Sequence, residues 1–578
     1  MNDTSMTIAV SNDQKADRQA YSQLIIDSEV TKKVIVAGPG TGKTTTFEGI
    51  LKHTGSINNL VLTFINRLVA DLSCRLDQYA TVMTLHKFCM GIFHQQYPQW
   101  YMVGALTKII GEDTEIKETI YEKLFHTLDE SNPLFKLYLQ RALYYKAISF
   151  NDSIYRVIRK ASVNPSIIPN YEKILIDEFQ DFSVLEVEFI KLLEDHGSIL
   201  IVGDDDQAIY NGKYDLGDSL RSLYRSGEYT KFELPFCSRC PKVIVESVSD
   251  IVENAVKKGY LQNRINKSFR AFEPGKEIVN ENYPKLQILN MASVNAAEVF
   301  LNMYISAILQ DELDDYRNRD GIEPLILVIG TTKYLNIFRS KMQNIAEYIE
   351  PKQNNNIEID QLCEGYRILL DDETSNIGWR LLLLSDKITP PKEHRRILNN
   401  SLNNTPLIDL LPEEYKQKHK ANVDLIREFI GAQESAAAEA NLEVVFGVPI
   451  KEKIVRYFRK VDGEESDSSS NSSYPIQFVT YQGSKGLAAD YVFLLGVNNG
   501  DIPKDPTKIA DYEICEFIVG LTRVKKECYV LPISNVYGEK KYRSVFLSWI
   551  TPQRVANSRF LSKNDVVELF RQCKTEKQ

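Results

Sequence analysis

The segment AGPGTGKT, Ala37 to Thr44, lies between a short apolar run at Lys33–Val36 and a helical stretch at Thr44–Leu51. Its glycines let backbone N–H groups turn inward, and the start of a helix adds positive partial charge, so the segment predicts a loop that binds phosphates. In such a loop Lys43 would reach the β and γ phosphates of a nucleotide, and the Thr44 hydroxyl would hold Mg²⁺. The usual pattern begins with glycine, and here the first slot is Ala37. We expect ATP and Mg²⁺ to bind at Ala37, Gly38, Pro39, Gly40, Thr41, Gly42, Lys43, Thr44 and Thr45.

A second apolar run, Lys173–Ile176, ends in two adjacent carboxylates, Asp177 and Glu178. Beside a phosphate-binding loop, the first carboxylate would hold Mg²⁺ through water, and the second would orient and deprotonate an attacking water. The alternative is a strand that ends in a solvated acidic turn. The loop upstream favours the catalytic interpretation, with Asp177 as a metal ligand and Glu178 as the base.

Short apolar runs alternate with helical stretches in two parts of the chain, which predicts parallel sheets covered by helices. The first part carries expected strands at Lys33–Val36, Asn59–Phe64, Lys173–Ile176 and Ser198–Val202. The second carries expected strands at Leu286–Leu289, Leu325–Ile329, Ile476–Tyr481, Tyr491–Leu495 and Cys528–Leu531. Helical segments interrupt both parts, and the Ser-rich run Glu464–Ser473 (EESDSSSNSS) predicts a flexible connection. The expected fold class is α/β, with two sheet domains that each carry a mainly helical insertion.

The composition sets limits on the class of protein. At 578 residues the chain is long enough for roughly three to five domains. The net charge of -9 argues against a wholly basic nucleic-acid coat, but it allows a local basic and aromatic track. No run approaches eighteen apolar residues and Met1–Arg18 is polar, so we expect a cytoplasmic protein without a membrane span. Cys237 and Cys240 form one CxxC without a second ligand pair, which favours structural or incidental cysteines over zinc.

Further motifs, in a fixed order along nearly the whole chain, resemble those of the UvrD/Rep/PcrA-type superfamily 1 helicases. Each short motif is weak alone, and together they are specific. Asp177–Asp181 (DEFQD) resembles the Walker B element, and Gly203–Tyr210 (GDDDQAIY) resembles motif III. The other motifs are similar to Ia at Thr63–Asn66, Ib at Thr84–His86, V at Thr480–Leu487 (TYQGSKGL) and VI at Val519–Arg523 (VGLTR).

The resemblance implies two RecA-like P-loop domains that clamp ATP between them. It places the first RecA-like domain at residues 1–88 and 166–235, with a helical insertion at 89–165. It places the second at residues 236–345 and 475–578, with a reduced insertion at 346–474. The second insertion is shorter than in the housekeeping helicases, which suggests a specialised member.

The resemblance also implies roles for single residues. Gln207 would couple the γ-phosphate to the DNA track, and Arg239 and Arg523 would reach across as arginine fingers. Gly486 would lie at the nucleotide. A glutamine that reads the adenine edge would be Gln23 or Gln19, and the spacing to the loop lysine favours Gln23. The expected DNA contacts are Thr63, Phe64, Asn66, His86, Tyr210 and Thr480.

Two of these DNA assignments have simpler alternatives. Phe64 ends an expected strand, so without the family match a core position would be favoured for its ring. His86 is equally well explained as a histidine at the start of a helix. The aromatic candidates would stack on bases, and the polar ones would contact the strand backbone.

Three positions depart from the family pattern. Ser238 stands where a tyrosine stacks on adenine, Gly212 where a tryptophan stacks on DNA, and Ala488 where a glutamate follows Lys-Gly-Leu. Tyr214 is a candidate substitute for the tryptophan.

The implied function is an ATP-dependent 3′–5′ DNA helicase or translocase acting on single-stranded DNA or on a single-strand/duplex junction. The alternative is an ATP-gated sensor subunit of a nuclease or antiphage-defence complex without processive unwinding. Partners would be a nuclease or another DNA-repair or defence protein.

Overall fold

The computed structural model describes most of the chain and divides it into two compact units. Unit 1 is formed by Met1–Leu85, Ile168–Pro351 and Asn471–Gln578, and unit 2 by His86–Ile167 and Lys352–Ser470. Gly212, Tyr214 and the Ser-rich run at 464–473, all of which carried expectations, lie outside the described residues. The described residues are 14–210, 218–282, 285–318, 323–351, 357–432, 436–458 and 474–576.

Unit 1 contains two parallel sheets of six strands each. The first has the order β3-β2-β6-β7-β1-β8. Its central strands are apolar and almost wholly buried, as expected for a parallel sheet with helices on both faces. The strands are β1 (Lys32–Ala37), β2 (Asn59–Thr63), β3 (Thr81–Thr84), β6 (Lys173–Ile176), β7 (Ser198–Gly203) and β8 (Thr230–Leu234). Its helices are α1 (Gln14–Ile26), α2 (Lys43–Thr54), α3 (Asn66–Leu76), α9 (Val184–Leu193) and α11 (Ser219–Ser226).

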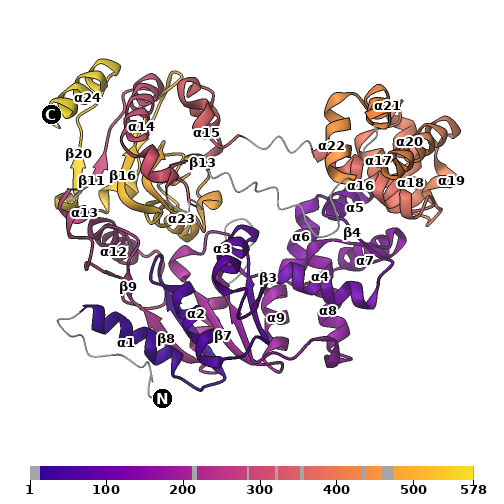
Figure 1. Cartoon of the computed structure of the whole chain (residues 1–578), viewed down its shortest axis with the longest axis horizontal. Helices are drawn as coiled ribbons and strands as arrows, with labels where there is room; N and C mark the ends of the chain where they lie inside the picture. Colours follow the sequence, from indigo (N-terminus) through magenta and orange to yellow (C-terminus); the bar gives the residue numbers. More distant parts are fainter. Residues whose placement is uncertain are drawn as a thin grey trace. The chain divides into compact units, whose positions relative to one another are not determined.

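The second sheet has the order β13-β12-β14-β16-β11-β20, and its two faces are covered by different helices. In β12, Leu327 and Ile329 pack with α12 and α23, whereas Ile326 and Val328 pack with α14 and α15. Figure 1 shows α14 and α24 beside each other on this domain. The strands are β11 (Leu286–Ile288), β12 (Ile326–Ile329), β13 (Ile476–Val479), β14 (Ala489–Leu495), β16 (Val524–Leu531) and β20 (Val555–Asn557). The helices are α12 (Lys242–Lys257), α14 (Val294–Arg317), α15 (Thr332–Arg339), α23 (Asp511–Leu521) and α24 (Lys563–Glu576).

The expected α/β class and every expected strand are confirmed, although several strand bounds differ by a few residues. Within these two sheets, three strands were not predicted: β3, β8 and β20. All three lie at sheet edges, where one side of the strand faces no neighbour and the sequence needs no continuous apolar run.

Unit 2 is helical, apart from a parallel pair of two-residue strands, β4 (Tyr101–Met102) and β5 (Ala147–Ile148). Among the described residues, no helix is both long and apolar enough to cross a bilayer. The helices from the first insertion are α4 (Leu85–Gln96), α5 (Leu106–Thr114), α6 (Glu118–His126), α7 (Pro133–Tyr145) and α8 (Phe150–Ala161). Those from the second are α16 (Ile357–Asp371), α17 (Asn376–Ser385), α18 (Pro391–Ser401), α19 (Leu407–Leu410), α20 (Glu413–Gly431), α21 (Ala436–Phe446) and α22 (Val448–Phe458).

A buried ionic network joins the two insertions into this one unit. The Asp113 carboxylate of α5 accepts hydrogen bonds from Arg141 of α7 and Arg380 of α17, each at 2.9 Å. Arg141 also donates to the carbonyl of Ser401 at 2.9 Å, and Tyr145 donates to Asp113 at 2.5 Å. The three charged side chains are at most 3% exposed, so water does not screen these contacts.

Candidate nucleotide site and nucleic-acid track

The predicted phosphate loop connects β1 to the first residue of α2. Gly40 and Gly42 adopt φ of +68° and +94°, which L side chains rarely adopt. The Thr41 hydroxyl donates to the Gly38 carbonyl at 2.9 Å and closes the turn. Helix α2 begins at Lys43, so the N–H groups of its first turn face the loop.

A segment of the second α/β domain packs directly on this loop. The N–H of Ser238 donates to the Gly40 carbonyl at 2.8 Å. A Cβ at Gly40 would lie 2.3 Å from Cβ of Arg239, so only glycine allows this approach. Cys237 and Cys240, on either side, are buried free thiols in the core of the second domain. The structure therefore places Arg239 at the phosphate loop.

Lys43 and the two acidic residues after β6 meet in the same place. The Lys43 ammonium donates to Glu178 at 2.6 Å and lies 3.8 Å from Asp177. Gln180 donates to the second oxygen of Glu178 at 2.6 Å. Burial opposes ionisation of Glu178, but the charges of Lys43 and Lys485 outweigh it and hold the pKa of this carboxyl below its usual range. Glu178 is therefore a carboxylate, as a proton acceptor requires.

The donors expected for Mg²⁺ fit that ion. Asp177 is 5% exposed and comes directly after β6, and one of its oxygens accepts the N–H of Glu178 at 2.9 Å. Thr44 follows Lys43, whose ammonium faces the Asp177 carboxylate. A carboxylate and a hydroxyl are hard oxygen donors of the kind Mg²⁺ prefers. Asp177 and Thr44 would hold the ion together with phosphate oxygens.

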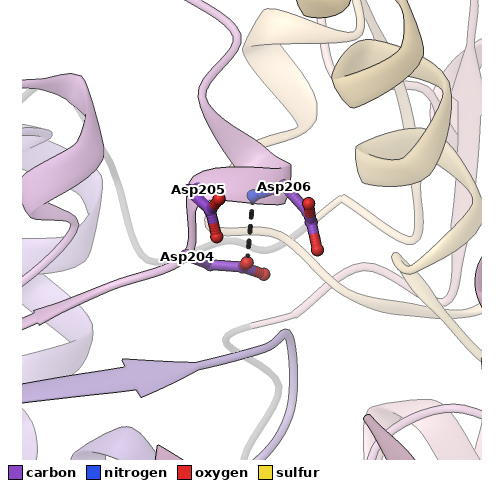
Figure 2. Close-up of side chains that lie close together, drawn as sticks. All are labelled: Asp204, Asp205 and Asp206. Atoms are coloured by element: carbon purple, nitrogen blue, oxygen red, sulfur yellow. Dashed lines mark hydrogen bonds between the residues drawn. The ribbon is translucent and has the colours of Figure 1, made fainter. Parts of the chain in front are cut away.

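A different acidic cluster, the triad Asp204, Asp205 and Asp206, lies on the turn after β7 (Figure 2). Within it the N–H of Asp206 donates to Asp204 at 3.1 Å. The Lys267 ammonium forms ion pairs with all three carboxylates, and Arg264 and Arg221 pair with Asp206 and Asp205. Three cations of the chain therefore balance three carboxylates, and the triad is satisfied without a metal ion.

The expected coupling residue and one expected arginine finger are in contact. Gln207 donates to the Asp204 carboxylate at 2.7 Å. Arg523, which follows α23 in the second domain, donates to the side-chain oxygen of Gln207 at 2.9 Å. Arg523 is only 2% exposed and also donates to the carbonyl of Val519 at 2.9 Å. A cationic group from the second domain thus lies at the turn that follows β7 in the first.

Gln23 lies on the exposed face of α1, and its expected contact with adenine stays a prediction. Gln23 is exposed on α1 and donates to Asp27 of the same helix at 2.6 Å. The buried face of α1 carries Asp17, Tyr21 and Ile25, so Gln23 and the alternative, Gln19, fall on the exposed face.

Arg18 of α1 lies at the phosphate loop, and the sequence did not predict a role for it. Its guanidinium is 3.3 Å from the Ser238 hydroxyl and 4.6 Å from the ring centre of Phe272. A Cβ at Gly42 would also lie 3.3 Å from Arg18. The sequence signal that could have pointed to Arg18 is its position next to the face that α1 buries.

Gly486 has a packing role in the structure. It adopts a φ of +82°, and a Cβ there would lie 2.9 Å from the Leu68 side chain of α3. The glycine therefore permits close approach of the motif V turn to the first domain.

The two aromatic candidates for the DNA track lie together. The ring centres of Phe64 and Tyr210 are 5.4 Å apart, and both residues are half-buried, so Phe64 is not a core residue. Lys485 lies 5.9 Å from the Tyr210 ring centre. The pair forms an aromatic platform with a cation beside it.

The polar candidates are more scattered. Thr63 is fully buried, and its hydroxyl has no hydrogen-bond partner among the described residues. Asn66 is exposed at the start of α3, and Thr480 accepts the N–H of Gly483 at 3.0 Å within its own turn. His86 belongs to unit 2, where its ring packs edge-on against Phe150 with centres 5.8 Å apart.

A second aromatic and basic surface was also missed by sequence reasoning. Two short strands of the second domain, β17 (Asn535–Val536) and β18 (Glu539–Lys540), form a hairpin. Tyr537 and Tyr542 are 70% and 65% exposed, and Lys540 lies 5.2 Å from the Tyr542 ring centre. The sequence signal for this surface was the segment Tyr537–Arg543 (YGEKKYR), which contains two tyrosines and three cations.

Comparisons with known proteins agree with this site. A family model described as an AAA domain matches residues 20–213. The chain is similar to a probable DNA helicase II homolog of Mycoplasma pneumoniae, with 21% identity over 93% of this chain and 85% of the relative. It is similar to the ATP-dependent DNA helicase PcrA of Bacillus subtilis, with 18% identity over 86% of this chain and 80% of the relative. It also matches the exonuclease/helicase subunit RexA of Lactococcus lactis, with 24% identity over 40% of this chain and 19% of the relative.

Two parallel-sheet domains, a phosphate loop, a paired acidic motif and helicase relatives together define an ATP-dependent DNA helicase. The order of the motifs along the chain and these relatives make the chain similar to the UvrD-like superfamily 1 helicases.

Proposed function

We propose that this helicase moves 3′ to 5′ on single-stranded DNA in the cytoplasm, driven by closure of its two RecA-like domains on ATP. The observation that carries the proposal is the contact of Arg523 in the second domain with Gln207 in the first, at 2.9 Å. A phosphoryl group in transfer needs cationic stabilisation, worth roughly 10³–10⁵ in rate. When the second domain supplies the cation, hydrolysis depends on domain closure.

The residues of the nucleotide site divide the chemical work. Lys43 binds the β and γ phosphates, and Arg239 and Arg523 stabilise charge on the transferring group. Glu178, kept ionised by its lysine neighbours, accepts a proton from the attacking water. When bound, Mg²⁺ neutralises charge on the phosphate oxygens beside Asp177 and Thr44.

The DNA strand would run over the platform formed by Phe64 and Tyr210. Stacking of bases on aromatic rings is worth about 1–3 kcal/mol per base and tolerates any sequence. Thr63, Asn66, His86 and Thr480 are proposed to contact the strand backbone. The exposed surface of Tyr537, Lys540 and Tyr542 extends the track on the second domain. Cyclic closure of the domains then moves the strand relative to the site, including at a junction with duplex.

The decisive test combines two assays on the full chain. ATP hydrolysis is measured with and without single-stranded DNA, for the wild type and for Glu178→Gln. We expect strong stimulation by DNA and loss of hydrolysis in the variant. Strand displacement is then compared on duplexes with a 3′ tail and with a 5′ tail, and displacement from the 5′ tail alone would refute the proposed direction.

A second candidate function is an ATP-gated sensor subunit that works with a nuclease or another repair or defence protein. The match to RexA, which is named as an exonuclease/helicase subunit, favours it. The departure at Ser238 also favours it, since the family's tyrosine at that position stacks on adenine. A sensor would hydrolyse ATP on DNA without displacing either strand in the same assay.

A further inference from the structure

One buried lysine of the second domain, Lys485, reaches into the nucleotide site of the first domain. It follows a short 3₁₀ turn, Gln482–Ser484, that comes after β13. The left-handed Gly486 next to it lets this turn approach α3 closely. The Lys485 side chain is 1% exposed, although lysine is almost never fully buried unless it is paired.

The Lys485 ammonium contacts both catalytic segments of the first domain. It forms a short ion pair with Asp181, which lies on the 3₁₀ turn directly after Glu178. It donates to the backbone carbonyl of Gln207 at 2.9 Å and lies 3.6 Å from the second carboxylate oxygen of Glu178. A single cation therefore joins the segment that carries the base to the segment that carries the coupling glutamine.

The carboxyl of Asp181 has the Lys485 ammonium as its counterion. Asp181 is fully buried, and its other carboxylate oxygen has no hydrogen-bond partner among the described residues. Burial raises the pKa of Asp181 to about 7 even with the lysine beside it, so without Lys485 this carboxyl would take up a proton and lose its ionic link to the second domain. Within the first domain, Gln180 links the same segments, because it donates to Glu178 and accepts the N–H of Asp204 at 2.9 Å. Lys485 adds the link that comes from the second domain.

We propose that Lys485 is a positioning residue, which fixes Glu178 and Gln207 relative to each other only while the second domain is in place. The ring of Tyr210 lies 5.9 Å from the ammonium, so the same side chain connects this alignment to the proposed DNA platform. This inference rests on the proposed roles of Glu178 and Gln207. A misplacement of about 1 Å in a catalytic group lowers a rate by about 10²-fold, so loss of Lys485 has a large effect on turnover.

The test measures steady-state ATP hydrolysis by the full chain with single-stranded DNA. For Lys485→Met we expect kcat to fall by about 10–100-fold, while KM for ATP stays within about twofold, because the phosphate loop is untouched. Lys485→Arg keeps the charge and is expected to have a higher kcat than Lys485→Met. The control is Lys526→Met, since Lys526 of β16 also forms two ion pairs, but with Glu312 and Asp490 of the second domain itself.

A double variant separates positioning from stability. Lys485→Met combined with Asp181→Asn leaves no unpaired buried charge, so its thermal stability should recover towards that of the wild type. If Lys485 positions the catalytic groups, kcat stays low in the double variant, and this comparison also serves if the single variant does not fold. Recovery of kcat in the double variant, or an equal loss in the Lys526→Met control, would overturn the inference.

Glu178→Gln, assayed in parallel, keeps the two proposals apart. Hydrolysis that persists in Glu178→Gln would contradict the proposed role of the base. An inactive Glu178→Gln together with a Lys485→Met of wild-type kcat would contradict only the role of Lys485.

Discussion

Neutralising Asp113 should selectively destabilise unit 2. The substitution Asp113→Asn keeps the shape of the side chain and removes the one carboxylate that Arg141 and Arg380 share. Arg380 would keep Glu112 at 2.9 Å, and Arg141 would keep the carbonyl of Ser401. Two buried guanidinium groups would then face each other with half of their neutralising charge removed.

The size of the effect follows from burial. Breaking a buried ion pair by removing one partner costs about 3–5 kcal/mol, because the remaining charge is uncompensated. Unit 2 spans about 200 residues, and in a domain of that size 1 kcal/mol shifts Tm by about 2–4 °C. The melting transition of unit 2 should therefore fall by about 6–20 °C.

The assay is thermal unfolding combined with hydrogen exchange of the amides in α5, α7 and α17. The control is Arg395→Ala, which breaks the Arg395–Glu115 ion pair between the same two insertions. These side chains are 67% and 59% exposed, so we expect a cost below about 1 kcal/mol. If Asp113→Asn melts within about 2 °C of Arg395→Ala, the buried network does not hold the insertions together and the reasoning fails.

Three further predictions concern the nucleotide and DNA sites. Gly40 and Gly55 have φ of +68° and +69°, so alanine at either position costs about 1–2 kcal/mol of stability. Only at Gly40 would the added methyl group meet another residue. Gly40→Ala should therefore lower kcat for ATP by about 10–100-fold, and a similar loss in Gly55→Ala would contradict this. Arg18→Ala should raise KM for ATP by up to about tenfold through loss of a charged hydrogen-bond donor, and an unchanged KM would remove Arg18 from the site. Phe64→Ala and Tyr210→Ala should each raise the Kd for single-stranded DNA by about 5–150-fold in fluorescence anisotropy, and unchanged binding would exclude the platform.

The sheets and the phosphate loop were predictable because their signals are local. An apolar run that ends at a glycine-rich turn or at two carboxylates specifies both the strand and the chemistry at its end. The edge strands β3, β8 and β20 were not predicted because their sequences mix polar and apolar residues. The choice of Gln23 rests on its spacing to Lys43, which says nothing about which face of α1 a residue occupies.

The cations that organise the site were beyond sequence reasoning for a different reason. Lys485 and Asp181 are 304 residues apart, and Lys267 meets the Asp204–Asp206 triad through a separate loop. Nothing in a local pattern links such partners. The pairings form only when the two sheets of unit 1 bring their loops together.

The single body formed by the two insertions has a mechanical consequence. Each insertion leaves its own RecA-like domain and returns to it, so the chain enters unit 2 twice and exits twice. Because the Asp113 network ties the insertions together, two routes connect the two sheet domains: the direct chain between β8 and β9 (Phe236–Cys237), and the path through unit 2. The connectivity therefore closes a loop. Under the proposed domain closure, a relative movement of the two sheet domains has to be compatible with both routes.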